Sequence, residues 1–213
     1  MKNSIPFGVI FLSLFICAGF NFSKSEGWTS LFDGKSLKDW KVGKNADTFT
    51  VEDGMIVVHG KTAHLFYVGG FKNHNFKNFD FKSDVMTTSG SNSGIYFHTQ
   101  YQEDGWPSKG YEVQVNNSHT DWRRTGSLYG IDDVKDVFVK DNEWFTERII
   151  VQGKRVIIKI NEKMVVDYTE PANVQRPEDM AGRIISSGTF ALQGHDPKSK
   201  VYFKNLLIRP MAD

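Results

Sequence analysis

Short segments with the alternating pattern of β-strands follow one another along most of this chain, and no segment shows the period of an amphipathic helix. We count about a dozen such segments, separated by turn signals such as Asp53-Gly54. Segments 145–151, 154–160 and 164–168 predict a meander of adjacent antiparallel strands. A chain of this kind buries its apolar faces between two sheets, so we expect an all-β, two-sheet antiparallel jelly-roll sandwich.

The segment 110–117 carries the first indication of a functional site. Its apolar residues Tyr111, Val113 and Val115 alternate with polar ones, so we expect the apolar face to pack on the core. The polar residues, about 7 Å apart along the strand, are Glu112, Gln114 and Asn116. A carboxylate beside two carboxamides can hydrogen-bond several hydroxyls of a sugar, and the carboxylate can also transfer a proton.

Two further segments place polar residues opposite apolar ones. Tyr96 and His98 occupy the polar positions of segment 95–98, and Gln193 and His195 those of segment 189–195. The apolar residues that we expect in the core of these segments are Phe97, Phe190 and Leu192. In a two-sheet sandwich such polar faces turn away from the core, and on one curved sheet they converge on a common surface.

From this convergence we predict an active site in which Glu112, His195 and His98 are catalytic. The residues that we expect to bind the substrate are Gln114, Tyr96, Gln193, Asn92, Trp106 and Asn116. Trp106 lies at the tip of a loop, where an exposed indole commonly stacks on a sugar ring. Each of these residues also has an ordinary alternative, as a solvated, turn-forming or core-capping side chain.

Composition and charge exclude several classes of partner. The 213 residues include 26 basic and 25 acidic side chains, for a net charge of +1, and no basic block is present. Nucleic acids and anionic membranes are therefore poor candidates. The sequence also lacks a glycine-rich phosphate loop, a Cys/His zinc pattern and a nucleophile elbow.

The N-terminus has the organisation of a signal peptide. Lys2 precedes an apolar run over residues 5–20, and Ala18 and Gly19 lie near a plausible cleavage site. We therefore predict a signal peptide over residues 1–25, a single domain over 26–213, and export to the periplasm or the extracellular space. The apolar run is too short for a confident membrane span. The single cysteine, Cys17, lies in this leader, and Ile16 before it argues against a lipoprotein anchor.

Five short motifs occur in an order that resembles the 3-keto-disaccharide hydrolase family. They are 31–34 with Leu37 and Trp40, 92–95, 110–114, 192–195 and 203–206. The resemblance implies a concanavalin A-like lectin/glucanase jelly roll, export in bacteria and action on oxidised glycosides. Glu112, Gln114 and His195 fall on matching positions, whereas His98 stands where many members have Arg.

The residues and the resemblance together point to cleavage of the glycosidic bond of 3-keto-glycosides, by hydrolysis or by elimination followed by hydration. Ordinary glycosidases need two carboxylates, about 5–5.5 Å apart in retaining enzymes, and only Glu112 is well placed. Elimination needs a base, an acid and a donor to the enolate oxygen, which His195, Glu112 and one of His98, Gln114 or Tyr96 could supply. No cofactor is required, although a divalent metal held by His98, His195 and Glu112 is possible.

Two other functions remain open from the sequence. A carbohydrate-binding module or lectin would use the same polar face without chemistry. A structural interaction domain would explain the fold but not the polar face. For the enzyme and for the lectin, the expected partner is a carbohydrate, namely an oxidised di- or oligosaccharide or a glycoside.

Overall fold

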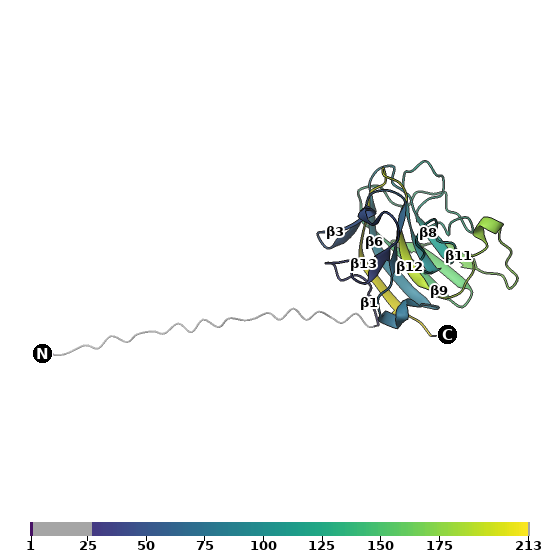
Figure 1. The fold of residues 1–213 in the computed structure, drawn as a ribbon, viewed down its shortest axis with the longest axis horizontal. Coiled ribbons are helices and arrows are strands. Elements are labelled where there is room, and N and C mark those ends of the chain that lie inside the picture. The colour runs from purple at the N-terminus through teal and green to yellow at the C-terminus, as the bar shows by residue number, and fades with distance from the viewer. Residues whose placement is uncertain (2–26, 213) are drawn as a thin grey trace.

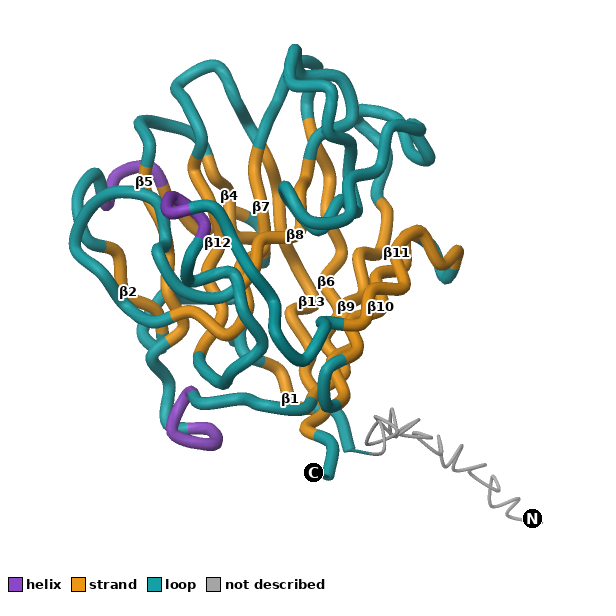
Figure 2. Tube along the Cα trace, turned by 90° about the vertical axis from the view of Figure 1, so that its right-hand side faces the viewer, coloured by secondary structure: helices purple, strands orange, loops and turns teal. Residues whose placement is uncertain are grey.

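The computed structural model of this protein describes Met1 and residues 27–212 and confirms the all-β, two-sheet antiparallel jelly-roll sandwich (Figure 1). The described strands form an eight-stranded sheet in the order β11-β10-β9-β6-β13-β4-β3, with β1 paired to β13, and a five-stranded sheet in the order β2-β5-β12-β7-β8. Figure 2 shows the strands in orange and the loops that join them in teal. The predicted signal peptide and Cys17 lie outside the described residues.

The eight-stranded sheet contains β1 (Thr29–Ser30), β3 (Phe49–Glu52), β4 (Met55–Val58), β6 (Phe79–Thr87), β9 (Phe145–Gln152), β10 (Arg155–Ile160), β11 (Lys163–Thr169) and β13 (Val201–Pro210). The five-stranded sheet contains β2 (Trp40–Val42), β5 (Ala63–Tyr67), β7 (Ser93–Thr99), β8 (Tyr111–Val115) and β12 (Thr189–Gly194). The described residues also form three short 3-10 helices: η1 (Ala46–Thr48), η2 (Phe71–His74) and η3 (Glu178–Met180). No described helix is long and apolar enough to cross a lipid bilayer.

Local sequence accounts for the hairpins. β3 and β4 pair from Phe49 with Val58 to Glu52 with Met55, so that Asp53-Gly54 forms a two-residue turn. Both turn residues have positive φ, 48° and 78°, as a turn that matches the twist of the strands requires. The predicted meander is β9, β10 and β11, which pair in sequence order.

Aromatic side chains fill the space between the two sheets. The Phe190 ring of β12 stacks on Phe81 of β6 at 4.5 Å between centroids, and Phe79 approaches the same ring edge-on at 4.9 Å. The predicted core residues are all buried in this cluster, namely Phe97, Val113, Val115, Phe190 and Leu192. Because strands alternate, their neighbours on β7, β8 and β12 face the outer side of the five-stranded sheet.

Candidate active site

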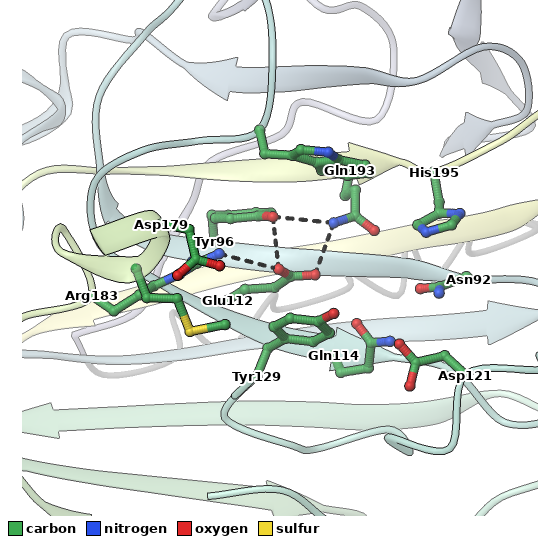
Figure 3. Close-up of a pocket in the computed structure, with 12 residues that line it drawn as sticks. Asn92, Tyr96, Glu112, Gln114, Asp121, Tyr129, Asp179, Arg183, Gln193 and His195 are labelled. Atoms are coloured by element: carbon green, nitrogen blue, oxygen red, sulfur yellow. Dashed lines mark hydrogen bonds and ion pairs between the residues drawn. The ribbon is translucent and has the colours of Figure 1, made fainter. Parts of the chain in front are cut away.

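A cavity of about 320 Å³ lies on the outer side of the five-stranded sheet, over β7, β8 and β12 (Figure 3). We call it the central cavity. Sheet register brings its floor together, because Tyr96 pairs with Glu112 and with Ala191 on the neighbouring strands. Its lining residues are Asn92, Tyr96, Trp106, Glu112, Gln114, Asp121, Tyr129, Asp179, Met180, Arg183, Gln193 and His195. Seven of the nine predicted site residues are therefore among them.

Glu112 is the centre of a buried hydrogen-bond network in this cavity. The Tyr96 hydroxyl donates to Glu112 Oε2 at 2.7 Å, and Gln193 Nε2 donates to Oε1 at 2.8 Å. Arg183 Nη2 lies 3.5 Å from Oε2. Burial raises the pKa of Glu112, and Arg183 with the two hydrogen bonds opposes this rise. Burial and the neighbouring Glu112 hold the pKa of Tyr96 well above its usual value, so Tyr96 remains a hydroxyl donor.

His195 lines the cavity and is held by the residue that follows it. Its Nδ1 lies 2.8 Å from Asp196 Oδ2, and Asp196 also accepts hydrogen bonds from Ser199 Oγ and the Lys198 backbone N–H. Burial opposes ionisation of Asp196, but these hydrogen bonds outweigh it and lower its pKa to about 2. Because an ionised carboxylate only accepts, Nδ1 is the donor and Nε2 of neutral His195 keeps a free lone pair. That nitrogen can act as a base.

Three buried amides of the cavity each have one polar atom without a hydrogen-bond partner among the described residues. These atoms are Gln114 Nε2, Gln193 Oε1 and Asn92 Oδ1. A buried donor or acceptor left without a partner costs about 1–3 kcal/mol. Such a cost is recovered when a ligand or ordered water supplies the missing partner. The cavity thus offers one donor and two acceptors to a hydroxylated or carbonyl-containing ligand.

A glycine of β7 and an exposed tryptophan also shape the site. A Cβ atom built on Gly94 would lie 2.7 Å from Glu112 Oε1, so only glycine leaves room for the carboxylate there. The Trp106 side chain is 50% exposed, as expected for a stacking residue. Its ring lies 5.6 Å from the His195 ring and 5.4 Å from that of His64.

The prediction that His98 faces this surface is wrong. His98 has φ = 55°, which breaks the alternation of β7 and turns its side chain to the other side of the sheet. There its ring packs edge-on against Phe79 and Phe97, at 5.6 and 5.2 Å between centroids. Its Nε2 contacts the Lys77 carbonyl at 2.9 Å, and its Nδ1 accepts from the Ser186 backbone N–H. His98 is therefore a buried packing residue and does not line the central cavity.

Asn116 also does not line the central cavity, contrary to prediction. It is fully buried, and its Nδ2 donates to the carbonyls of Asp121 and Arg123 while its Oδ1 accepts from the His119 backbone N–H. Asn116 thus shapes the loop after β8. That loop in turn carries Asp121 to the cavity wall.

Sequence reasoning missed the residues that two loops contribute: Asp121 and Tyr129 after β8, and Asp179, Met180 and Arg183 before β12. Arg183 lies over the Tyr96 ring at 5.1 Å, and its Nη1 donates to the Gly110 carbonyl. These loops have no period that would predict their path. One available signal was Gly182, where a Cβ would lie 1.8 Å from the Ser108 carbonyl oxygen, so the loop before β12 touches the loop between β7 and β8 there.

One set of side chains could hold a metal ion. Donor atoms of His119, His195 and Asp196 lie within 4.8 Å of one another, and two imidazoles with a carboxylate suit divalent transition metals. The predicted ligand set is not brought together, because His98 lies on the other side of the sheet. His119 Nδ1 already accepts from the Asp121 backbone N–H at 3.1 Å, so neutral His119 carries its proton on Nε2. The existing hydrogen bonds therefore fit proton transfer at least as well as metal binding.

Known proteins resemble this chain in sequence and in fold. The family described as the 3-keto-alpha-glucoside-1,2-lyase-like domain matches residues 27–209. A 3-keto-disaccharide hydrolase of Bacteroides thetaiotaomicron is 27% identical over 171 residues, which are 68% of this chain and 59% of that protein. The chain therefore matches about three fifths of the length of this curated relative.

Two solved structures share the architecture. A proposed glycosyl hydrolase from Parabacteroides distasonis has 26% identity and a TM-score of 0.73, and the match covers 89% of this chain and 96% of that one. The carbohydrate-binding module CBM66 from Bacillus subtilis has 15% identity and a TM-score of 0.54, and the match covers 86% and 95% of the two chains. The second likeness shows a common fold and nothing more.

Proposed function

Since this chain belongs to the 3-keto-disaccharide hydrolase family, we propose that it cleaves the glycosidic bond of 3-keto-glycosides by proton abstraction and elimination. The chain is a carbohydrate-active, hydrolase-like protein; the keto substrate and the elimination are the proposal. The observation that carries it is the His195–Asp196 pair in the wall of the cavity that also holds Glu112. A fixed base beside a second proton-transferring group is what this reaction needs and what a lectin does not.

The proposed reaction starts at C2 of the sugar, whose proton is acidified by the ketone at C3. His195 Nε2 takes this proton, and the C2–H electron pair forms an enolate with the C3 oxygen. The enolate then collapses: the C3 carbonyl re-forms, a C1–C2 double bond appears and the C1–O glycosidic bond breaks. The leaving oxygen takes a proton from an acid. Addition of water across C1–C2 gives the same net result as hydrolysis, and no oxidant or reductant is consumed.

Among the remaining roles, we assign the acid to Glu112. Burial raises its pKa, which brings the protonated form closer to neutral pH than in an exposed glutamate. Gln114 is our choice for the donor to the C3 oxygen. Its buried Nε2 has no hydrogen-bond partner among the described residues, whereas the Tyr96 hydroxyl is already committed to Glu112 and His98 is outside the cavity. A preorganised donor of this kind stabilises developing negative charge.

No cofactor takes part in this scheme, because proton transfers alone complete it. A divalent ion at His119, His195 and Asp196 is the alternative, and it would polarise the carbonyl instead. Metal analysis of the purified protein, with activity before and after chelation, decides between the two. We also propose export of the protein, on the basis of the charge and hydropathy pattern of the leader.

The test is incubation with a matched panel of 3-keto-glycosides and their unoxidised parents in deuterated water. Cleavage of the keto substrates alone, with deuterium at C2 of the product or of recovered substrate, is the expected result. Cleavage of a keto-glycoside without deuterium at C2 would point to direct hydrolysis and refute the elimination. Tight sugar binding without turnover of any glycoside would instead identify a lectin. The same polar cavity would then bind a sugar without catalysing its cleavage.

A further inference from the structure

A second cavity, of about 190 Å³, lies over the β2–β5 end of the same five-stranded sheet. It takes its walls from the segment after β2, from β5 and from the loop between β7 and β8. Its lining residues include Asn45, Thr62, His64, Phe66, Gln102 and Glu103. No step of the proposed reaction uses it.

His64 and Trp106 separate this second cavity from the central one. The His64 ring packs edge-on against Tyr96 and against Trp106, each at 5.4 Å between centroids. Both of these residues line the central cavity, while His64 lines the second. Trp106 thus presents a half-exposed ring at the boundary, where a ligand passing from one cavity to the other would cross it.

The side-chain Nε2 of His64 has no hydrogen-bond partner in the described part of the chain. Its side chain is buried, and Nε2 is out of contact with solvent. Burial, with Arg183 and His195 nearby, lowers its pKa to about 3, so the ring is neutral and offers one donor and one acceptor. A buried imidazole without partners is costly unless a ligand or an ordered water supplies them.

Hydrogen bonds within the protein hold the walls of the second cavity in place. Its two walls are joined by the Lys44 backbone N–H, which donates to the Glu103 carbonyl at 3.0 Å. Within the loop, Gln102 Nε2 donates to the carbonyls of Asp104 and Trp106 at 2.8 Å each, and Gln102 Oε1 accepts from the Ser108 backbone N–H. The loop that carries Trp106 is therefore held in place before a ligand binds.

The chemistry of the second cavity suits a neutral, hydroxylated ligand. Its charges are internally partnered, since Lys44 pairs with Asp104 and the Tyr101 hydroxyl donates to Glu103. The Phe66 ring, which lines it, packs edge-on against Tyr101 at 5.5 Å. Aromatic surface beside partnered polar groups favours a sugar over a phosphate or a free cation.

We propose that the second cavity binds a neighbouring glycosyl unit of the substrate, a neutral pyranose that hydrogen-bonds to His64. The second unit then lies across Trp106 from the unit in the central cavity, and His64 is the residue that distinguishes a disaccharide from a simple glycoside. This inference rests on the proposed function for its substrate class.

The kinetic test compares a 3-keto-disaccharide with the matching methyl 3-keto-glycoside in His64→Phe. Phenylalanine keeps the ring contacts with Tyr96 and Trp106 and removes both nitrogens. We expect kcat/KM to fall about tenfold or more for the disaccharide and to stay within about twofold for the methyl glycoside. Trp106→Ala is the companion variant and should impair both substrates, because its ring lines the central cavity, which both substrates occupy. An equal effect of His64→Phe on the two substrates would overturn the proposal.

Binding measurements keep this test independent of turnover. Calorimetry of the wild-type protein with trehalose, maltose and cellobiose, each against methyl glucoside, should show at least one disaccharide about tenfold tighter. In wild-type protein the His64 ring resonances should shift with that disaccharide and not with methyl glucoside, even if the variant fails to fold. A disaccharide preference without turnover would refute the proposed chemistry and leave the second sugar site standing. Absence of any disaccharide preference, with unchanged His64 resonances, would overturn the second site itself.

Discussion

Replacement of Asp196 by asparagine tests the assignment of His195 as the base, because it changes the hydrogen bonds of one carboxylate oxygen and almost no shape. Asp196 Oδ1 accepts from the Lys198 backbone N–H, and Oδ2 accepts from His195 Nδ1 and Ser199 Oγ, all at 2.8 Å. In Asp196→Asn the amide oxygen keeps the Lys198 bond and the NH₂ group faces His195. An amide donor forces Nδ1 to accept, so the proton moves to Nε2 and the base is lost.

The expected loss of activity is that of a general base. Such a group contributes about 10²–10⁴ in rate, which is about 2.7–5.5 kcal/mol of activation free energy at about 1.36 kcal/mol per tenfold. The expected loss in the free energy of unfolding is smaller than this loss in activation free energy. The pKa of Asp196 falls from 3.8 to about 2, so its ionised form stabilises the fold by about 2 kcal/mol. Because the pKa is lowered, this stability is present above pH 3.8 and is lost as the pH falls through about 2.

The assay is kcat and KM against pH on a 3-keto-glycoside, with thermal unfolding measured in parallel. We expect kcat to fall in Asp196→Asn while KM changes little, since the cavity keeps its shape. Asp33→Asn is the matched control: hydrogen bonds from the Lys35 and Ser36 backbone N–H groups lower the pKa of Asp33 to about 2 in a similar turn, and Asp33 does not line the central cavity. Asp33→Asn should retain full activity.

Two results would refute this reasoning. If Asp196→Asn keeps kcat within about threefold, Asp196 does not set the His195 tautomer in catalysis, because loss of a general base costs at least about 10². If Asp33→Asn loses activity to the same extent, the loss reflects stability and not the base.

Three further changes test other parts of the site and fold. Glu112→Gln should lower kcat by about 10² or more while keto-glycoside binding, measured by calorimetry, changes much less; full activity would remove Glu112 from the catalytic residues. Gly94→Ala should lower kcat/KM by about tenfold with little change in melting temperature, because the new Cβ displaces the Glu112 carboxylate, 2.7 Å away; wild-type kinetics would show that the carboxylate position is not critical. Glu147 is fully buried on β9, neither of its oxygens has a hydrogen-bond partner in the part of the chain that the structure describes, and burial raises its pKa well above 4.5. Its contribution to stability is therefore full below pH 4.5 and is lost as the pH rises through the folded-state pKa. Glu147→Met should raise the free energy of unfolding at pH 8 by about 1–3 kcal/mol and flatten its decline with pH; an unchanged pH profile in denaturant titrations would contradict this.

Alternation within each strand was sufficient to predict the fold class and most of the cavity floor. Glu112, Gln114, Tyr96 and Gln193 face the cavity because their apolar neighbours face the core, and this follows from the two-residue period of a strand. The same rule failed for His98, where a positive φ ends the alternation within β7. A residue with positive φ is uncommon outside glycine, so nothing in the sequence indicated the break.

The chain order alone could not predict which residues meet. The sheet order β5-β12-β7-β8 brings Tyr96 next to Gln193, 97 residues later, and the loop before β12 brings Arg183 to Glu112, from which it is 71 residues away in the sequence. Arg183 and Tyr129 come from loops without a period, and their positions depend on contacts with distant segments. The sequence therefore determined the faces of the strands through local sterics and hydrophobic burial, whereas only the tertiary structure decided the partners of each side chain, because hydrogen bonds and ion pairs act over a few ångströms and not along the chain.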